Sequence, residues 1–386
     1  MVSVSRILIQ HRPRLTYADL PAIALDAQVS SLLDLEAPVA IGVSGGKDSQ
    51  AAALASVAYL DHVGHRGPRI LVRSDLGMVE WADSLPVCQA LADHLGLELL
   101  VLRRAAGGMM ERWEARWASS RARYEALETV TLVLPWSTPD KRFCTSELKT
   151  HLIAAALRRR WPGRTIVNVT GIRREESVRR AKGAVASLDE ATGIMDWRPL
   201  SDWTLRQTLD CVAASGLALH LAYRVHRMSR VSCAYCIMSN ASDLQHASAA
   251  EETHGLYRRM VQLEIDSSFS FQGTRWLGDV RTELLSPQAA QALVAAKAMA
   301  ASRIALEAAI TPAMRFVKKW PTRMLTNPEA DCLAGVRRGV AEMFGLNARH
   351  TTRSEIHDHY AALIAAKAAK AAREAAVKPR RRLAQA

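Results

Sequence analysis

The sequence predicts an α/β fold, in which a mainly parallel sheet is flanked by helices and followed by a helical C-terminal region. Three observations support this fold. In the first half of the chain, short apolar runs alternate with helical patterns. The second half holds long helical patterns without clear strand signals. Hydrophobic residues make up 49% of the 386 residues, which is enough for a sizeable buried core.

The expected elements follow one another as crossover units do. A short lead-in carries one helical pattern over 17–33. Four short apolar runs then predict strands, and the helical segments between them imply parallel pairing. We expect the strands at 39–43, 69–73, 98–102 and 165–169, and the first two helices between them at 48–59 and 86–95.

From about residue 242 helical patterns dominate. They cover 287–309, 328–344 and 355–376. The last residues are rich in Ala, Lys and Arg, so we expect a frayed helix that continues into a disordered basic tail. The predicted domains are a lead-in (1–36), a nucleotide-binding α/β domain (37–240), a helical region (241–365) and the basic tail (366–386).

Charge and cysteine content narrow the function classes. The net charge of +13 favours polyanionic partners such as nucleotides or nucleic acid. No apolar run approaches the ~20 residues of a membrane span, and no signal-peptide pattern opens the chain. We therefore expect a cytoplasmic protein with no membrane partner. Six cysteines in a chain of this length do not indicate a disulfide framework.

The segment 44–49, Ser-Gly-Gly-Lys-Asp-Ser, is the strongest functional signal. It follows an expected strand and opens an expected helix, so backbone N–H groups and the helix N-terminus can hold a phosphate. The glycines permit close approach, the lysine neutralises charge, the serines donate hydroxyl groups, and the aspartate can help to hold Mg²⁺. The pattern differs from the Walker A motif. The expected nucleotide contacts are Ser44, Gly45, Gly46, Lys47, Asp48 and Ser49.

This loop resembles the PP-loop of the adenine nucleotide α-hydrolase superfamily, and other segments are similar to its phosphoadenosine phosphosulfate (PAPS) reductase branch. Residues 71–77 end in Asp-Leu-Gly, like the family's second strand. Residues 171–180 resemble its G-x-R-x-x-E-S-x-x-R element, 197–203 its W-x-P…W segment, and 220–236 its Y…R-x-x-C-x-x-C segment. The resemblance spans roughly residues 37–240 and implies a Rossmann-like (HUP-type) sheet.

The resemblance also implies further site residues. Arg173 would project at the carboxyl end of the sheet, where open α/β sheets bind ligands, and arginine forks suit phosphate or sulfate. Glu176 is equally well explained as a structural partner of Arg173, and Trp197 and Trp203 are better explained as core residues. The additional nucleotide contacts implied are Asp75, Gly77, Gly171, Arg173, Glu176, Ser177, Arg180 and Arg230.

Cys233 and Cys236 form a C-x-x-C pair, and Cys144 is the best candidate to complete a site. Three thiolates can hold a 4Fe–4S cluster with one iron open, as in related thiolation enzymes. With Cys211 as a fourth ligand, Zn²⁺ fits equally well. Three unrelated buried thiols remain the alternative.

The chain departs from the PAPS reductases in its thiols. It lacks their C-terminal E-C-G-x-H element, and Cys332 instead lies on an expected helix. We therefore expect an enzyme that binds ATP with Mg²⁺, adenylates an acceptor with release of pyrophosphate, and delivers sulfur, with nucleic acid as a candidate acceptor. The expected catalytic residues are Lys47, Asp48, Arg173 and Cys144.

Two other functions stay open. The first is a PAPS or adenylyl-sulfate reductase with an unorthodox thiol. The second is a non-catalytic subunit that binds nucleotide, or binds DNA or RNA through the basic tail. Trp113 and Trp117 alternate with arginines and could stack on bases, but an amphipathic helix with both tryptophans in the core is favoured.

Overall fold

The computed structural model describes residues 14–383, with side chains up to residue 375. The chain divides into two compact units. The first unit comprises residues 1–111 and 137–257, and the second comprises 112–136 and 258–386. The structure therefore differs from the single boundary expected near residue 240, because the segment 112–136 belongs with the helical C-terminal region.

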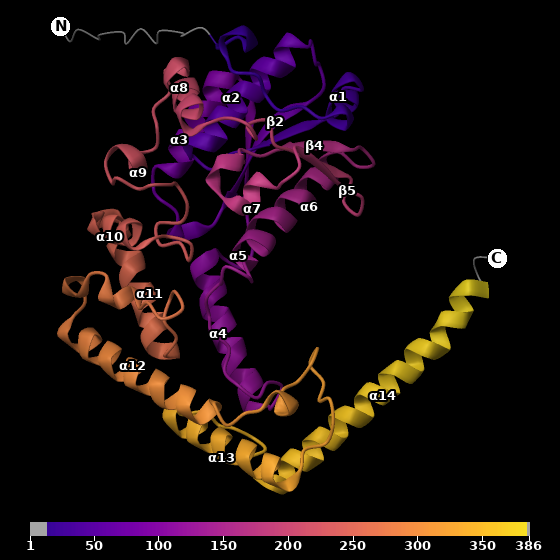
Figure 1. Cartoon of the computed structure of the whole chain (residues 1–386), viewed down its shortest axis with the longest axis vertical. Coiled ribbons are helices and arrows are strands. Elements are labelled where there is room, and N and C mark those ends of the chain that lie inside the picture. The colour runs from indigo at the N-terminus through magenta and orange to yellow at the C-terminus, as the bar shows by residue number, and fades with distance from the viewer. Residues whose placement is uncertain (1–13, 384–386) are drawn as a thin grey trace, which may run out of the picture. The chain divides into compact units, whose positions relative to one another are not determined.

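The first unit is built on a sheet flanked by helices (Figure 1), and its six strands have the order β3-β2-β1-β4-β6-β5. All neighbouring strands pair in parallel except β5, which is antiparallel to β6. The strands are β1 (Val39–Gly42), β2 (Arg69–Asp75), β3 (Glu98–Arg103), β4 (Ile166–Val169), β5 (Ala186–Asp189) and β6 (Ile194–Trp197). The predicted α/β class is confirmed, and the direction of winding reverses between β1 and β4.

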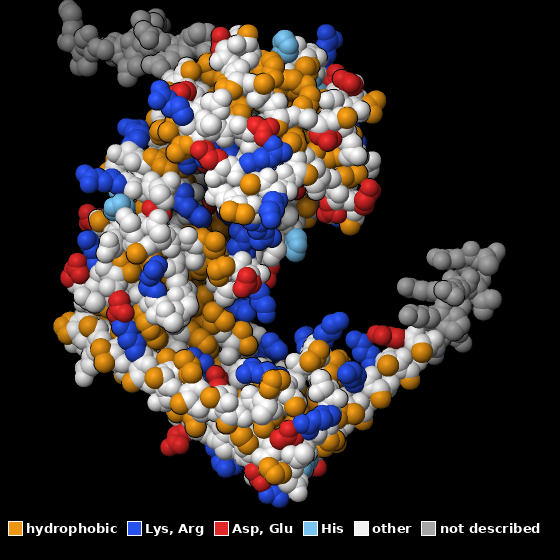
Figure 2. Space-filling view, in the orientation of Figure 1, with side chains coloured by type: hydrophobic (Ala, Val, Ile, Leu, Met, Phe, Trp, Pro, Cys, Tyr) orange, Lys and Arg blue, Asp and Glu red, His pale blue; other side chains and the backbone are white. Residues whose placement is uncertain are grey.

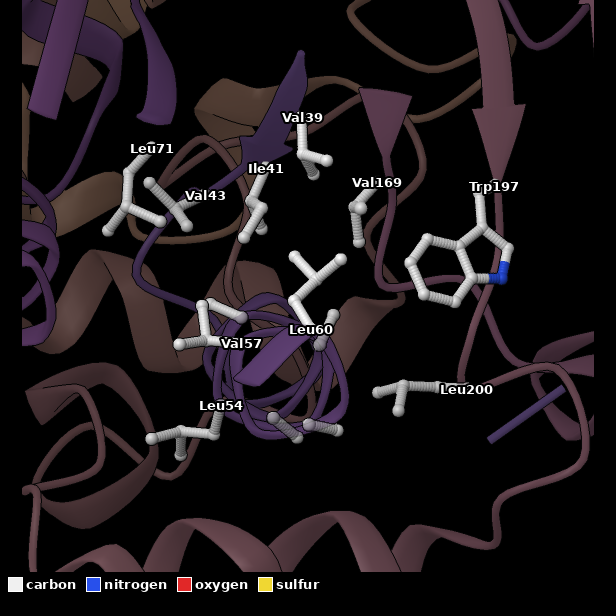
Figure 3. Packing of buried hydrophobic residues seen from close by; sticks show 14 of the residues in the cluster. Val39, Ile41, Val43, Leu54, Val57, Leu60, Leu71, Val169, Trp197 and Leu200 are labelled. Atoms are coloured by element: carbon white, nitrogen blue, oxygen red, sulfur yellow. The ribbon is translucent and has the colours of Figure 1, made fainter. Parts of the chain in front are cut away.

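Helices cover both faces of this sheet. On one face, Val57 and Leu60 of α2 point toward Ile41 and Val169 of the strands (Figure 3). On the other face, Leu157 of α6 packs with Ala40, Ile70 and Ile166. Strands buried on both faces are apolar throughout, which is why they read as short continuous runs in the sequence. The longer helices here are α2 (Lys47–His62), α3 (Ser84–Leu95), α6 (His151–Arg160), α8 (Leu205–Ser215) and α10 (Ala241–Ala249).

The expected helix over 17–33 is interrupted. A 3-10 turn at Tyr17–Asp19 is followed by extended chain and then by α1 (Ala27–Asp34). Pro21 lies in the extended part, where its missing N–H and fixed φ do not support a helix. The other short helices of this unit are α5 (Phe143–Thr145), α7 (Val178–Ala181) and α9 (Leu221–Arg224).

The second unit is helical. It contains most of α4 (Met109–Glu125) and α11 (His254–Ser267), together with α12 (Pro287–Glu307), α13 (Asn327–Phe344) and α14 (Arg353–Leu383). Trp113 and Trp117 of α4 are buried, and their rings meet those of Trp136, Phe269 and Phe344. Both tryptophans are therefore core residues, and these contacts explain why 112–136 belongs to this unit.

The C-terminal helix is longer than expected. α14 runs from Arg353 to Leu383, so residues 366–383 are helical where we expected a disordered tail. Alanine, lysine, arginine and glutamate all have high helix propensity, and they dominate this stretch.

Among the described residues, α12 is the one helix with the length and composition of a membrane span, at a mean hydropathy of 1.2. Alanine rather than larger apolar residues supplies most of this hydropathy. Arg303 in the same helix is buried and pairs with Glu307 at 2.9 Å. Arg303 Nη2 also donates to the Ser268 carbonyl oxygen at 3.5 Å, and its guanidinium carbon lies 3.9 Å from the centre of the Phe269 ring, so this part of α12 packs within the second unit.

Candidate functional site

The loop between β1 and α2 has the geometry of an anion-binding turn. Gly45 has φ of 81°, a conformation that glycine adopts readily. Gly46 is the N-cap of α2 and provides no side-chain cap, so the helix end keeps its positive potential for a ligand. Ser49 Oγ donates to Gly46 O at 2.8 Å and accepts from Ser44 N at 3.2 Å. The Ser49 hydroxyl therefore closes the loop on itself.

Three charged side chains converge beside this loop. Arg173 Nε donates to Asp48 Oδ1 at 2.7 Å, and Lys47 Nζ donates to Asp48 Oδ2 at 3.1 Å. Lys47 and Arg173 are only 8% and 4% exposed. Burial opposes the charge on Arg173, but its hydrogen bond to Asp48 and the charge of Asp48 outweigh burial and raise its pKa. Two buried cations thus share the Asp48 carboxylate, and Arg173 Nη1 also pairs with Glu175.

Gly171 explains how Arg173 reaches Asp48. A Cβ atom at Gly171 would lie 2.4 Å from the Asp48 carbonyl oxygen and 2.9 Å from Ser49 N. Only glycine therefore lets the loop after β4 pack against the first turn of α2. In the G-x-R element, Gly171 lets the loop approach α2 closely, and this approach places Arg173 within hydrogen-bond distance of Asp48.

The segment that begins at His220 supports the loop from another side. His220 is fully buried; its Nε2 bonds to Ser84 Oγ at 3.0 Å, and its Nδ1 accepts from Ala222 N at 3.0 Å. Because Nδ1 accepts, Nε2 carries the proton, and burial lowers the pKa of this imidazole. His220 Cδ2 lies 3.1 Å from the position of a Cβ on Gly45, so the ring fixes the loop.

Tyr223 forms a second contact from this segment. Its ring centre lies 5.1 Å from Lys47 Nζ, and its hydroxyl accepts from Val231 N at 3.1 Å. The sequence placed His220 and Tyr223 in a motif but gave neither of them a role. Their contribution depends on contacts between segments far apart in the chain, which the motif alone does not show.

A mainly apolar cavity of about 290 Å³ lies beside α6, and it runs from the carboxyl ends of β1 and β4 to the turn between β5 and β6. Asn168 Nδ2 donates to Asp196 Oδ1 at 2.6 Å on its wall. The hydroxyl of Thr170 is buried without a protein partner, so it is available to a ligand. The cavity also reaches Gly42, the last residue before the loop. It coincides with the reversal of the sheet, where open α/β sheets bind ligands.

The other expected nucleotide contacts are engaged elsewhere. Asp75 Oδ1 accepts from Gly77 N at 2.7 Å, which closes the turn after β2. Glu176 accepts from Arg173 N at 2.9 Å and pairs with Arg180, which supports its structural role. Two further residues lie outside this cluster: Ser177 caps α7, and Arg230 Nη2 lies 3.5 Å from Cys236 Sγ. Arg173 is thus the arginine that contacts the loop.

The three expected cysteine ligands lie in one region but do not form a metal site. Burial, reinforced by Cys236 and more weakly by Cys144, raises the pKa of the Cys233 thiol to about 12. Within the part of the chain that the structure describes, no group of three or more His, Cys, Asp or Glu side chains could hold a metal ion. The described geometry therefore does not fit a 4Fe–4S cluster or Zn²⁺. Cys211 lies in the hydrophobic core of α8 instead of serving as a fourth ligand.

Comparison with known proteins identifies one family. The family model described as phosphoadenosine phosphosulfate reductase domain matches residues 38–238, just over half of the chain. No curated protein matches. The crystal structure of phosphoadenylyl-sulfate (PAPS) reductase from Candida auris, in a phosphate complex, is 12% identical with a TM-score of 0.35 and covers 55% of this chain and 98% of that chain. The U34-tRNA thiolase NcsA from Methanococcus maripaludis, with its 4Fe–4S cluster, is 14% identical with a TM-score of 0.27, over 59% and 72% of the two chains.

Proposed function

The chain belongs to the phosphoadenosine phosphosulfate reductase domain family, and from that membership we propose that it is an enzyme that binds an adenine nucleotide on the loop 44–49. The observation that carries the proposal is the convergence of Lys47 and Arg173 on Asp48 at the N-terminus of α2. Backbone amides, a helix N-terminus and two buried cations together form a site for phosphate oxygens.

We propose that the nucleoside occupies the cavity beside α6, with its base or ribose against the few polar groups on the wall. Gly42 joins the cavity to the loop, and Asn168, Thr170 and Asp196 offer donors and acceptors for a base or a ribose. The unpartnered hydroxyl of Thr170 supports this assignment, because a buried hydroxyl without a partner costs free energy that a ligand would recover.

The proposed reaction is adenylation. An acceptor nucleophile attacks the α-phosphorus of ATP, the bond to the β-phosphate oxygen breaks, and pyrophosphate leaves with the electron pair. Lys47 and Arg173 would balance the charge that develops on the phosphate oxygens, so catalysis rests on positioning and electrostatics. His220 is not assigned as a base, because its Nδ1 lone pair accepts from the Ala222 backbone N–H and its protonated Nε2 faces Ser84 Oγ.

Mg²⁺ would arrive with the nucleotide. Asp48 is the carboxylate within the loop 44–49, but both of its oxygens accept hydrogen bonds from Lys47 and Arg173. The described residues therefore fit a cation that is held mainly by phosphates, with Asp48 as an added ligand once one of these contacts opens.

We propose adenylation ahead of PAPS reduction because the chain lacks a thiol in the position that reductases use. Cys332 lies on α13, where its Sγ is 3.6 Å from the Ala309 carbonyl oxygen, and not in a terminal E-C-G-x-H element. Family membership nevertheless favours PAPS or adenylyl-sulfate reductase as the second candidate function.

Product analysis separates the two reactions. The purified chain is incubated with ATP and Mg²⁺, or with PAPS and a thiol reductant, and pyrophosphate and sulfite are measured. We expect pyrophosphate from ATP, and its release should be lost in Lys47→Ala and retained in the exposed control Lys182→Ala. Sulfite from PAPS with no pyrophosphate from ATP would replace the proposal with the reductase.

We further propose that Cys144, Cys233 and Cys236 lie where the sulfur is delivered, with nucleic acid as the acceptor. In this step a hydrosulfide donor from solution attacks the adenylated carbon, a carbon–sulfur bond forms, and AMP leaves with the electron pair of the carbon–oxygen bond. Anaerobic purification followed by iron, zinc and absorption measurements tests whether a metal takes part. A broad band near ~400 nm that is lost in Cys233→Ser would indicate a cluster that reorganises these thiols. Sulfur transfer by metal-free protein would assign the chemistry to the thiols alone, and full activity in all three Cys→Ser variants would exclude both.

A further inference from the structure

We propose that the second unit binds single-stranded nucleic acid in a basic groove. The groove consists of two adjoining cavities of about 530 and 170 Å³, which share Arg123, Glu128 and Lys319. The segments that line it are the end of α4 with the residues 126–131 that follow, the residues 315–320 after η8 (Pro312–Met314), and residues 349–350 with the first third of α14. Figure 2 shows Lys and Arg side chains gathered over the loop between α12 and α13 and the adjoining part of α14.

The charge of the groove is strongly positive. Arg123, Arg315, Lys319 and Arg349 line it, and the acidic residue among its lining residues is Glu128. Glu128 faces Arg123 at 3.7 Å and so offsets one of the four cations. A surplus of cations in a concave surface attracts a ligand with more than one negative charge.

A strained turn presents one of these cations. Val317 and Trp320 pair as a two-residue hairpin, with N–O distances of 2.8 and 3.1 Å. The two residues at its tip, Lys318 and Lys319, have φ of 51° and 74°. Asn-Gly is the usual solution at these positions, and a lysine at each carries backbone strain. Strain of this kind is concentrated at functional sites, and here it holds Lys319 and Trp320 on the wall of the groove.

The opposite wall is rigid. Arg337 of α13 is fully buried and donates to the carbonyl oxygens of Tyr124 at 2.9 Å and His350 at 3.0 Å. One guanidinium thereby fixes the two segments that carry Arg123 and Arg349. The rings of His350 and His359 lie 4.3 Å apart, and His359 Nε2 lies 3.1 Å from the Leu127 carbonyl oxygen. The site is therefore largely preformed.

These features favour a single strand over the other polyanions. Grooves that combine a line of cations with an aromatic ring bind single strands, because the cations follow the phosphates and the ring stacks on a base. The larger cavity has room for a nucleotide unit but not for a duplex. The cations extend over both cavities, so they can contact more than one phosphate. A mononucleotide has a single phosphate and would leave some of them without a contact.

This inference deepens the proposed function, since nucleic acid is the acceptor class proposed there, but it can be tested independently. Fluorescence anisotropy with the full chain measures binding of a labelled single-stranded 12-mer of mixed sequence, as DNA and as RNA. A 12-base-pair duplex and unlabelled AMP serve as competitors. Lys47→Ala, which impairs the proposed nucleotide site, should bind the strand as tightly as the wild type.

The decisive variant is Lys319→Gln with Arg349→Gln, both exposed side chains. We expect a loss of strand affinity of about 10-fold or more and a reduction of the salt slope by roughly 1.4, the value for two phosphate contacts on a single strand. The matched control, Lys182→Gln with Arg206→Gln in the first unit, removes the same charge and should change affinity less than about 2-fold.

Further results also test whether the strand binds in the groove. Trp320→Leu should weaken binding by about 10-fold, within the range of one stacked base, and circular dichroism verifies that it folds. Equal losses in the groove variant and the control would overturn the proposal, since binding would then follow net charge alone. Tighter binding of the duplex than of the single strand would also overturn it. So would complete displacement of the labelled strand by AMP at concentrations near the dissociation constant of AMP.

Discussion

Lys47 combines burial, charge and contact with the loop, so its removal tests the phosphate site at the scale of one residue. In Lys47→Ala, Arg173 still neutralises Asp48, and the fold is retained. We expect ATP affinity to fall by about 10- to 100-fold, the usual effect of losing a hydrogen bond to a charged group. Isothermal titration gives the affinity and a thermal melt verifies the fold. An affinity equal to that of the wild type would contradict the assignment of the loop.

Gly171 tests the contact between the two segments of the site. Gly171→Ala places a methyl group 2.4 Å from the Asp48 carbonyl oxygen, so we expect a loss of unfolding free energy of about 1–3 kcal/mol together with weaker nucleotide binding. The control is Gly335→Ala inside α13, where a Cβ meets nothing within 4 Å. That change should stabilise by about 0.5–1 kcal/mol through helix propensity. Urea denaturation measures both, and equal effects would contradict the close approach.

His220 makes the loop sensitive to pH. Burial lowers the pKa of the folded imidazole below its ordinary value of 6.5, so the unfolded chain takes up the proton first. The stability that His220 contributes is therefore present above pH 6.5 and declines as the pH falls through the folded pKa. The Asn side chain in His220→Asn can still accept from Ala222 N and does not titrate. We expect the difference in unfolding free energy between wild type and this variant to shrink from pH 8 to pH 5.5; a constant difference would contradict this account.

At the scale of elements, the two lysines at the tip of the hairpin 317–320 should lower the free energy of unfolding, while Lys319 should raise the affinity for a single strand. Replacing Lys318-Lys319 by Asn-Gly provides the residues that this turn favours, so we expect the free energy of unfolding to rise by about 1–2 kcal/mol. The same change removes a cation from the groove, so strand affinity should fall. Denaturation and anisotropy measure the two effects on one protein. Loss of stability would show that the lysines have native contacts that outweigh the strain.

The elements that local patterns predicted are those whose apolar residues follow one another at strand or helix spacing. β1, β2 and β4 are largely buried, and β3 is a partly exposed edge strand with a continuous apolar run. α2 and α13 begin and end within a few residues of the expected positions. The pair β5–β6 was not predicted, because β5 is a largely exposed edge strand of mixed polarity whose pairing depends on tertiary contacts. The loop 44–49 was also predictable, because its glycines, serines, lysine and aspartate are contiguous in the sequence and no contact with a distant segment is needed to recognise them.

At the scale of the molecule, the parts that the sequence did not predict depend on contacts between distant segments. Arg173 and Asp48 lie 125 residues apart, and Arg337 and Tyr124 lie 213 apart. The first contact completes the proposed nucleotide site, and the second helps to assign 112–136 to the helical unit. No periodicity or spacing in the sequence encodes such pairs, so the arrangement of the site and the discontinuous units required the structure.

The two units lead to a prediction about where each ligand acts. If nucleotide binds at the β1–α2 loop and a single strand binds in the basic groove, each should slow amide hydrogen exchange in its own unit. ATP with Mg²⁺ should protect peptides that contain 43–49 and 171–176, and a 12-mer should protect those that contain 315–320 and 349–360. Exchange measured by mass spectrometry on the full chain resolves these peptides.

The variants sharpen the test, because they separate the sites without dividing the chain. At an ATP concentration near the wild-type dissociation constant, Lys47→Ala should lose most of the protection by ATP and keep the protection by the strand. Lys319→Gln with Arg349→Gln should do the reverse. Protection of 43–49 by the strand in the absence of nucleotide would mean that the loop itself takes the nucleic acid. In that case the positive potential of the α2 N-terminus, and not the groove, would be the property that recognises phosphate in this protein.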